Sequence, residues 1–282
     1  MILTEFDYVK PTTLDEALAL LAAGGSRVLA GGQSLLVDLR TGDAPAPGRL
    51  IDIRGIDTLR GVRRMVDGGL RIGALTTFAE LSGSTEVRAQ APALAEAARS
   101  NGDPQVRNLG TAGGNLAAVG RATDLPVAAI AADVTVRLAG PDGELTLSAE
   151  EFAATGLPAS TIVTGLDVPP GDAARATAFE KTADRATRYP LCAVAVRATR
   201  AGDGTLSDCR IAVTGATARA LRLTGAEESL RGSAGGVREV LAAFRAQPGD
   251  LFVPGRGASA EYLRHLAGVL TARALARAAK SG

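Results

Sequence analysis

Two glycine pairs are the residues of this sequence best suited to bind a ligand. The first pair, Gly31-Gly32, is closely followed by Ser34, and the second, Gly113-Gly114, by Asn115. Glycine has no Cβ, so paired glycines let backbone N–H groups approach a ligand closely. A concave array of such groups holds an anion, most often phosphate. Two arrays far apart in the sequence would suit the two phosphates of a dinucleotide, although either pair alone is also compatible with a plain turn.

The common nucleotide-binding motifs are absent from the sequence. No Gly-x-Gly-x-x-Gly follows a strand pattern, and no Gly-x-x-x-x-Gly-Lys occurs. These are the signatures of Rossmann dinucleotide binding and of the P-loop. The pattern therefore favours a ligand held between two small α/β units, each of which contributes one glycine-rich turn.

Metal-ligating side chains are scarce. The sequence contains two cysteines, Cys192 and Cys209, and one histidine, His265. Two thiolates cannot supply the four of an ordinary iron–sulfur cluster, and the spacing fits no zinc site. Cys192 lies in the apolar run 191–196, which favours a small core residue. We therefore expect no metal site in this chain, and the iron or molybdenum of a complex would lie in other subunits.

Composition excludes several classes of partner. The formal net charge is +1 and no basic cluster stands out, which argues against nucleic acid or an anionic membrane as the main partner. The longest apolar runs, such as 125–132, are too short to insert across a bilayer. Residues 1–5 include an acidic side chain where a secretory signal would be basic, and no apolar segment follows. These features predict a cytoplasmic protein.

The elements that must position the glycine turns fall into three predicted units. Residues 1–57 predict a strand, a helix that begins after Thr13, a strand over 27–30, a loop and a strand over 50–53. Residues 58–172 predict a second α/β unit that ends at Pro169-Pro170-Gly171-Asp172. Its expected elements are strands over 70–74, 134–138, 145–147 and 161–168, and helices that begin after Thr77 and over 92–99 and 124–132.

The third predicted unit covers residues 173–282. Its pattern indicates strands over 176–181, 191–200 and 209–214, followed by helices over 237–245 and 259–279. We expect these three strands to form one antiparallel sheet.

An ordered set of motifs resembles the flavin-binding subunit of molybdenum hydroxylases. That family includes the medium subunit of aerobic carbon monoxide dehydrogenase and the central FAD domain of xanthine dehydrogenase. The motifs cover essentially the whole chain, and their order is specific although no single motif is. They are Phe6 to Leu18, Ala30 to Leu36, Gly69 to Thr77, Pro104 to Leu116 and Ser259 to Arg264.

The resemblance implies an α+β chain. Its first two units would form a two-subdomain FAD-binding fold of the vanillyl-alcohol-oxidase-like type, followed by an α+β C-terminal domain with a three-stranded sheet and helices. FAD would be the cofactor. The partners would be a large subunit with a molybdenum cofactor and a small subunit with 2Fe-2S clusters, in a heterotrimer or its dimer. Electrons would pass from the clusters through FAD to an external acceptor, so we expect no catalytic residue in this chain.

The resemblance also implies which residues contact FAD. Ser34 and the backbone amides around it would bind the pyrophosphate, and Thr111 and Asn115 the phosphates or the ribityl chain. Asn101 occupies a position where xanthine dehydrogenase has an aromatic residue near the ring. The complete expected set is Leu29, Ala30, Gly31, Gly32, Gln33, Ser34, Leu35, Leu36, Asn101, Gly110, Thr111, Gly113, Gly114, Asn115, Asp124 and Lys181.

Two charged residues of this set have a second interpretation. Asp124 would contact the adenosine half of FAD, but an Asp before Leu125-Pro126 also suits a helix cap. Lys181 is one of three lysines beside 28 arginines, and the other two lie near the chain ends. By resemblance its cation lies beside the N1–C2=O edge of the flavin, where it would stabilise the anionic reduced form. Alternatively, Lys181 is an exposed residue at the end of a strand.

Two other functions are compatible with the same motifs. The chain could be a free-standing FAD-dependent oxidoreductase that acts on a small molecule without molybdenum partners. It could also be a non-enzymatic assembly factor that retains FAD. The sequence names neither the substrate nor the electron acceptor.

Overall fold

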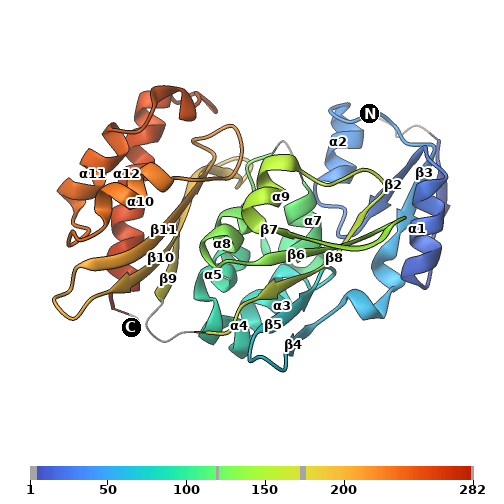
Figure 1. Cartoon of the computed structure of the whole chain (residues 1–282). Coiled ribbons are helices and arrows are strands. Elements are labelled where there is room, and N and C mark those ends of the chain that lie inside the picture. The colour runs from blue at the N-terminus through green and yellow to red at the C-terminus, as the bar shows by residue number, and fades with distance from the viewer. Residues whose placement is uncertain (1–4, 119–120, 172–175, 281–282) are drawn as a thin grey trace.

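The structure is a computed structural model that describes residues 5–118, 121–171 and 176–280. It contains three sheets that follow one another along the chain (Figure 1). The expectation drawn from residues 1–5 concerns residues 1–4, which lie outside the described residues. The expected boundary at 172–173 falls within 172–175, which also lie outside them.

The N-terminal unit is built on a parallel sheet. Its order is β1–β3–β2, and its core contains Ala17, Ile51 and Ile53. The elements are β1 (Asp7–Val9), α1 (Leu14–Ala22), β2 (Ser26–Leu29), α2 (Leu35–Thr41) and β3 (Arg49–Asp52), followed by 3-10 turns at Ile53–Gly55 and Asp57–Leu59. Helix α2 lies in the segment that we expected to be a loop. This helix buries only Leu39, so its apolar period is too weak to read from the sequence.

The second unit is a five-stranded antiparallel sheet in the order β4–β5–β8–β6–β7. The expected capping box at Thr77 is complete, because the Thr77 hydroxyl accepts from the Glu80 N–H while the Glu80 carboxylate accepts from the Thr77 N–H. The strands are β4 (Val62–Arg64), β5 (Leu70–Gly73), β6 (Thr135–Gly140), β7 (Gly143–Ser148) and β8 (Ile162–Val168). The helices are α3 (Phe78–Gly83), α4 (Thr85–Gln90), α5 (Pro92–Ser100), α6 (Pro104–Leu109), α7 (Ala112–Ala117), α8 (Leu125–Ala131) and α9 (Ala149–Thr155).

The C-terminal unit has one strand more than expected. Its antiparallel sheet runs β12–β11–β10–β9, because the two-residue strand β12 (Leu221–Arg222) pairs with β11 at the edge. A strand of two residues carries no readable alternation, so the prediction of three strands was wrong in this detail. The other elements are β9 (Ala176–Ala183), β10 (Pro190–Arg200), β11 (Leu206–Thr214), α10 (Thr224–Leu230), α11 (Val237–Arg245), a 3-10 turn at Gly249–Leu251 and α12 (Ala260–Ala278).

Strand β10 is buried on both faces, and this defines the layers of the molecule. Ala193 and Ala195 belong to the core shared with α5 and α8, whereas Val194 and Val196 belong to the core beneath α10, α11 and α12. Alternate residues of a strand point to opposite faces, so small alanines face one layer of helices and larger valines the other. The C-terminal sheet therefore lies between α5 and α8 on one side and α10 to α12 on the other (Figure 1).

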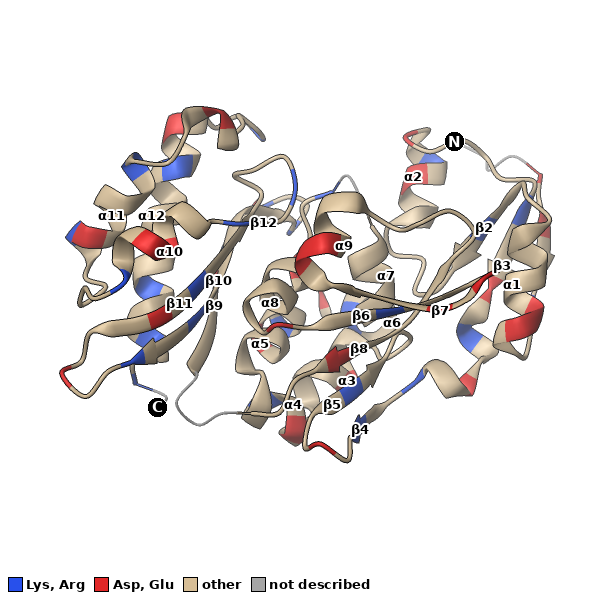
Figure 2. Cartoon of the chain, viewed as in Figure 1, with Lys and Arg blue, Asp and Glu red and all other residues tan. Residues whose placement is uncertain are grey.

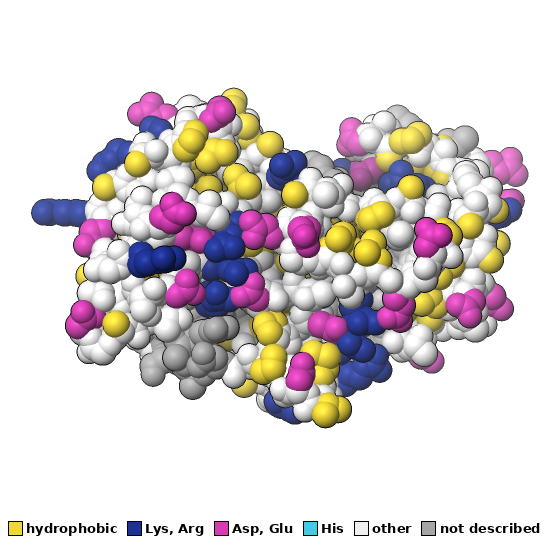
Figure 3. Space-filling model, viewed as in Figure 1, with side chains coloured by type: hydrophobic (Ala, Val, Ile, Leu, Met, Phe, Trp, Pro, Cys, Tyr) yellow, Lys and Arg dark blue, Asp and Glu magenta, His cyan; other side chains and the backbone are white. Residues whose placement is uncertain are grey.

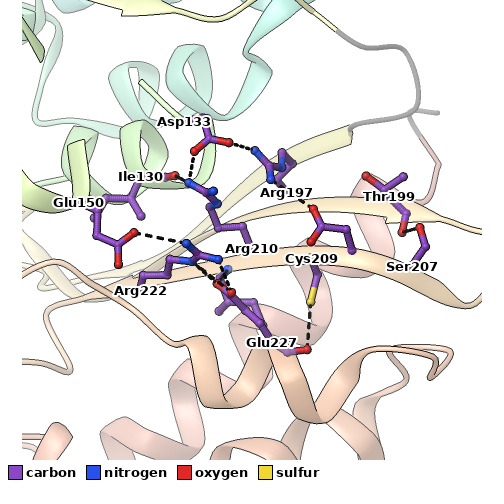
Figure 4. Close-up of polar contacts among 12 residues, drawn as sticks. Ile130, Asp133, Glu150, Arg197, Thr199, Ser207, Cys209, Arg210, Arg222 and Glu227 are labelled. Atoms are coloured by element: carbon purple, nitrogen blue, oxygen red, sulfur yellow. Dashed lines mark hydrogen bonds and ion pairs between the residues drawn. The ribbon is translucent and has the colours of Figure 1, made fainter. Parts of the chain in front are cut away.

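Ion pairs join the second unit to the C-terminal sheet. Asp133, which follows α8 with a φ of 57°, binds both Arg197 of β10 and Arg210 of β11 (Figure 4). Beside them, Arg222 of β12 pairs with Glu150 of α9 and with Glu227 of α10. Basic residues on β10 and β11 lie close to acidic residues of the neighbouring elements in the ribbon view (Figure 2), and basic and acidic side chains gather over this region of the surface (Figure 3).

Candidate functional site

The two glycine pairs, whose nearest members Gly32 and Gly113 are 81 positions apart in the sequence, border one cavity of about 800 Å³. Such a volume is typical of cofactor and ligand sites, which measure roughly 300–1,000 Å³. Thirteen of the sixteen residues expected to contact the ligand line this cavity, and the exceptions are Leu29, Leu36 and Lys181. The thirteen are Ala30, Gly31, Gly32, Gln33, Ser34, Leu35, Asn101, Gly110, Thr111, Gly113, Gly114, Asn115 and Asp124.

The first glycine pair lies in a loop whose backbone donors are unpaired. The N–H groups of the four residues Gly31 to Ser34 donate to no acceptor in the described part of the chain. Gly32 has a φ of 72°, a conformation that glycine adopts without steric cost. The Ser34 hydroxyl makes no cap to α2 either. Consecutive free donors of this kind form an anion-binding concavity.

Contact between the two glycine loops requires that Gly31 has no side chain. A Cβ built on Gly31 would lie 2.2 Å from the Leu109 carbonyl oxygen and 2.9 Å from the Gly110 Cα. Both atoms belong to the backbone of the second unit, so neither can move aside as a flexible side chain would. This close approach brings the first loop against the wall of the cavity formed by the second.

The second glycine pair does not form the turn of free amides that we expected. Gly113 and Gly114 lie in the first turn of α7, where the Gly113 N–H donates to the Ala74 carbonyl at 2.8 Å and the Gly114 N–H to the Thr111 hydroxyl at 3.2 Å. The Asn115 N–H donates to the Thr111 carbonyl at 3.0 Å. These glycines serve close packing instead, because a Cβ on Gly113 would lie 2.6 Å from the Ala74 Cβ.

Asn115, and not Asp124, caps α8. The Asn115 Oδ1 accepts from the Leu125 N–H at 3.1 Å, and the Asn115 carbonyl accepts from the Thr123 hydroxyl at 3.2 Å. Asp124 occupies the N-cap position but makes no side-chain cap bond, so its interpretation as a helix cap is wrong. The Asp124 carboxylate is left available for other contacts.

The Asp124 carboxylate belongs to a buried ion pair at the cavity wall. Its Oδ2 accepts from the Lys181 Nζ at 2.8 Å and from the Asn101 Nδ2 at 2.9 Å. The side chains of Lys181 and Asp124 are 6% and 2% exposed, which rules out Lys181 as an exposed strand-end residue. Burial raises the pKa of Asp124, while the Lys181 cation and the Asn101 hydrogen bond act in the opposite direction.

Sequence reasoning missed two groups of residues that line the cavity. One is the segment 155–163, which runs from the end of α9 into β8 and in which Gly156 and Ser160 have positive φ values of 80° and 53°. The turn residues Gly156 and Pro158 were the available signal for this loop. The other is Arg121, whose guanidinium lies 5.7 Å from the ring centroid of Tyr189, which also lines the cavity. No local pattern links these two residues.

The site therefore offers two kinds of unsatisfied polar group. The loop of residues 31–34 provides N–H donors at the cavity, and the Oδ1 of Asp124 is a buried acceptor with no hydrogen-bond partner among the described residues. A ligand with an anionic group fits the free N–H donors. Within the described ranges, no three His, Cys, Asp or Glu side chains are grouped so as to hold a metal ion, and no helix has the length and apolar character needed to cross a membrane.

Two domain families match the chain in succession. Residues 4–171 match the FAD binding domain in molybdopterin dehydrogenase, and residues 177–278 match the CO dehydrogenase flavoprotein C-terminal domain. The carbon monoxide dehydrogenase medium chain of Hydrogenophaga pseudoflava is 38% identical over 98% of this chain and 97% of its own length. The alpha subunit of the 6-hydroxypseudooxynicotine dehydrogenase complex of Paenarthrobacter nicotinovorans is 34% identical over 97% and 94%.

A solved structure agrees with these matches. A chain of the reconstituted CO dehydrogenase from Oligotropha carboxidovorans superposes with a TM-score of 0.91 at 30% identity, over 100% of both chains. The α+β architecture expected from the motifs, an FAD-binding domain followed by a C-terminal domain, is thus confirmed, as are FAD as the cofactor and an oxidoreductase subunit as the class of protein. This chain belongs to the family of FAD-binding subunits of molybdenum hydroxylases.

Proposed function

We propose that this chain carries FAD as the electron-transfer subunit of a three-part molybdenum hydroxylase. Its partners would be a large subunit with a molybdenum cofactor and a small subunit with 2Fe-2S clusters, from which electrons reach this chain and leave for an external acceptor. The observation that carries the proposal is the cavity bordered by the unpaired amides of residues 31–34. Two relatives support it, because one is the medium chain of a carbon monoxide dehydrogenase and the other is a subunit of a 6-hydroxypseudooxynicotine dehydrogenase complex.

The residues of the cavity fit FAD. The four free N–H groups would bind the pyrophosphate, whose negative charge such donors favour. Asp124 lines the same cavity, so this residue would lie beside the bound cofactor. When bound, FAD exchanges electrons singly or in pairs, and the protein contributes binding, orientation and electrostatics.

Cysteine chemistry supports the assignment of iron to a partner. Cys192 and Cys209 are the only cysteines of the sequence, and both are buried. Burial raises the pKa of each thiol to about 12, so neither is poised to act as a thiolate ligand. Two inert thiols suit a chain that depends on another subunit for its iron–sulfur clusters.

Anaerobic stopped-flow absorbance of the flavin tests the proposed function. We expect substrates such as aldehydes and N-heterocycles to leave the FAD of the isolated chain oxidised, because in the proposed function the substrate is oxidised at the molybdenum cofactor of the large subunit. After addition of the molybdenum and iron–sulfur subunits, the substrate of the complex should reduce this FAD. Reduction of the lone chain at a useful rate would instead favour a free-standing oxidoreductase. FAD that stays oxidised in the assembled complex would favour the assembly factor.

Elemental analysis of the isolated chain provides a second test. We expect less than stoichiometric iron, molybdenum and zinc after chelator treatment, together with FAD near one per chain, because two buried cysteines and one histidine cannot complete a site. One iron or more per chain would contradict the proposal that the iron–sulfur clusters lie in a partner subunit.

A further inference from the structure

A second cavity, of about 490 Å³, lies where the three units meet. The N-terminal unit contributes Asp38 of α2, and the second unit contributes Arg121. The C-terminal unit contributes Tyr189 and Arg256. Asp38, Arg121 and Tyr189 also line the first cavity, which the loop of residues 31–34 borders. Because these three residues line both cavities, an occupant of the second would be a close neighbour of the ligand in the first.

Arg256 has most of its hydrogen-bond donors unused. Its Nη1 donates to the Thr187 hydroxyl at 3.0 Å, and the Asp184 carboxylate is 4.0 Å from the same atom. A guanidinium carries five N–H groups, so this single hydrogen bond leaves four without an acceptor among the described residues. The side chain is 37% exposed, and its guanidinium lies 5.6 Å from the ring centroid of Tyr189 at the same cavity. These donors are therefore accessible to an oxyanion, which a guanidinium binds with two parallel hydrogen bonds.

The backbone of Arg256 has a conformation that favours other residue types. Arg256 is the first central residue of a two-residue turn in which Gly255 and Ala258 exchange N–H···O hydrogen bonds of 3.1 and 2.9 Å. Its φ is 49°, and that of the second central residue, Gly257, is 77°. Asn, Asp and Gly are preferred where such a turn needs a positive φ, and a long side chain is strained there. Strain of this kind concentrates at functional sites, and here it places a guanidinium at the cavity.

Arg121 supplies a second guanidinium to the same cavity. It forms an ion pair with Asp38, and its Nη1 donates to the Tyr189 hydroxyl at 3.4 Å. The ring centroid of Tyr189 is 5.7 Å from the Arg121 guanidinium and 5.6 Å from that of Arg256. Both positive charges therefore lie beside one aromatic ring and act on the same space.

The two carboxylates that line this cavity have partners of their own. Asp38 is paired with Arg121, and the exposed Asp43 accepts from the Thr41 hydroxyl at 2.7 Å. The Arg256 donors remain without a partner, and an incoming anion would also compete with Asp38 for Arg121. A small ligand with a negative charge fits these donors better than a neutral or a cationic one.

We infer that the second cavity binds the external electron acceptor, and that this acceptor is a small molecule with an anionic group held by Arg256 and Arg121. The inference rests on the proposed function, because FAD in the first cavity would be the electron donor. A quinone acceptor, for example, would take two electrons and two protons from reduced FAD (FADH2), which gives the hydroquinone and restores FAD. Asp38 opposes binding of the anion, since it occupies Arg121 and adds a negative charge.

Calorimetric titration with naphthalene-2-sulfonate tests the anion site at equilibrium. This probe has a negative charge and no oxidising group, and in the FAD-loaded full-length chain the cofactor keeps it from the free amides of residues 31–34. Arg256→Asn should weaken binding about tenfold, as expected for loss of a partly exposed charge-assisted contact. Asn tolerates the positive φ, so the guanidinium is removed without added strain. Asp38→Asn should tighten binding about threefold, because it frees Arg121 and removes a negative charge.

Reoxidation of photoreduced FAD tests the role of the cavity in electron transfer. Anaerobic stopped-flow absorbance gives second-order rate constants for 1,4-naphthoquinone-2-sulfonate and for neutral 1,4-naphthoquinone, which undergo the same two-electron chemistry. The ratio of the two constants cancels any change in the flavin itself. This ratio should fall about tenfold in Arg256→Asn and rise about threefold in Asp38→Asn, as binding of the inert probe does.

Arg238→Gln is the control for loss of a positive charge. Arg238 is exposed and lines neither cavity, so both measurements should match wild type. An unchanged rate ratio in Arg256→Asn and Asp38→Asn would overturn the inference, and so would sulfonate binding that does not depend on Arg256. A chain that holds no FAD, or FAD that the partner subunits cannot reduce, would instead refute the proposed function.

Discussion

Gly31→Ala is expected to yield a folded chain that lacks FAD. The new Cβ would lie 2.2 Å from the Leu109 carbonyl oxygen, so the loop of residues 31–34 must move away from the second unit. That movement separates the free N–H donors from the opposite wall of the cavity. Flavin absorbance per chain after gel filtration measures the effect, and we expect occupancy below about a tenth of wild type, equivalent to a loss of at least about 1.4 kcal/mol of binding free energy.

Gly202→Ala is the matched control for this substitution. Gly202 has no atom within 4 Å of an added Cβ and does not line the cavity, so its variant should retain full flavin occupancy. Gly32→Val should also lose FAD, because Gly32 has a φ of 72° and valine is strained there. If both Gly31→Ala and Gly32→Val retained wild-type flavin, the assignment of this loop to the cofactor would be wrong.

Asp133→Ala should produce a large loss of stability. It removes the carboxylate shared by Arg197 and Arg210, whose side chains are 10% and 18% exposed, and leaves Arg197 with Asp208 alone. Removal of one partner from a buried ion pair costs about 3–5 kcal/mol, and the 35% exposure of Asp133 reduces this to about 2–4 kcal/mol. Thermal unfolding followed by circular dichroism should show a midpoint lowered by roughly 5–12 °C.

Two further variants separate charge from backbone strain at this position. Asp133 has a φ of 57°, which disfavours alanine, whereas Asn and Gly tolerate it. Asp133→Asn and Asp133→Gly should therefore retain most of the destabilisation if the lost charge is its cause. Asp250→Ala, at an exposed position, serves as the control and should unfold like wild type. Stability of Asp133→Gly close to that of wild type would show that the ion pairs contribute little.

Much of the fold was predictable because local patterns carry it. The capping box at Thr77, the hairpin around Gly140 to Gly143 and the helix over 237–245 all occur as expected. Each depends on residues within a few positions of one another, so their spacing alone specifies the structure. Helix α2 buries only one residue and strand β12 has only two residues, so neither has a local pattern from which it could be predicted.

The sequence by itself determined where two glycine pairs, each closely followed by a small polar residue, could leave backbone amides free, because glycine adopts conformations such as the φ of 72° at Gly32. It also determined that two cysteines are too few for the four thiolates of an ordinary iron–sulfur cluster. Only the tertiary structure decided that Gly113-Gly114 packs against Ala74 and pairs its amides internally. Likewise, only the fold brought Lys181 onto Asp124, 57 positions away in sequence. Contacts of this kind depend on which helix packs on which sheet, and no short-range pattern encodes that choice.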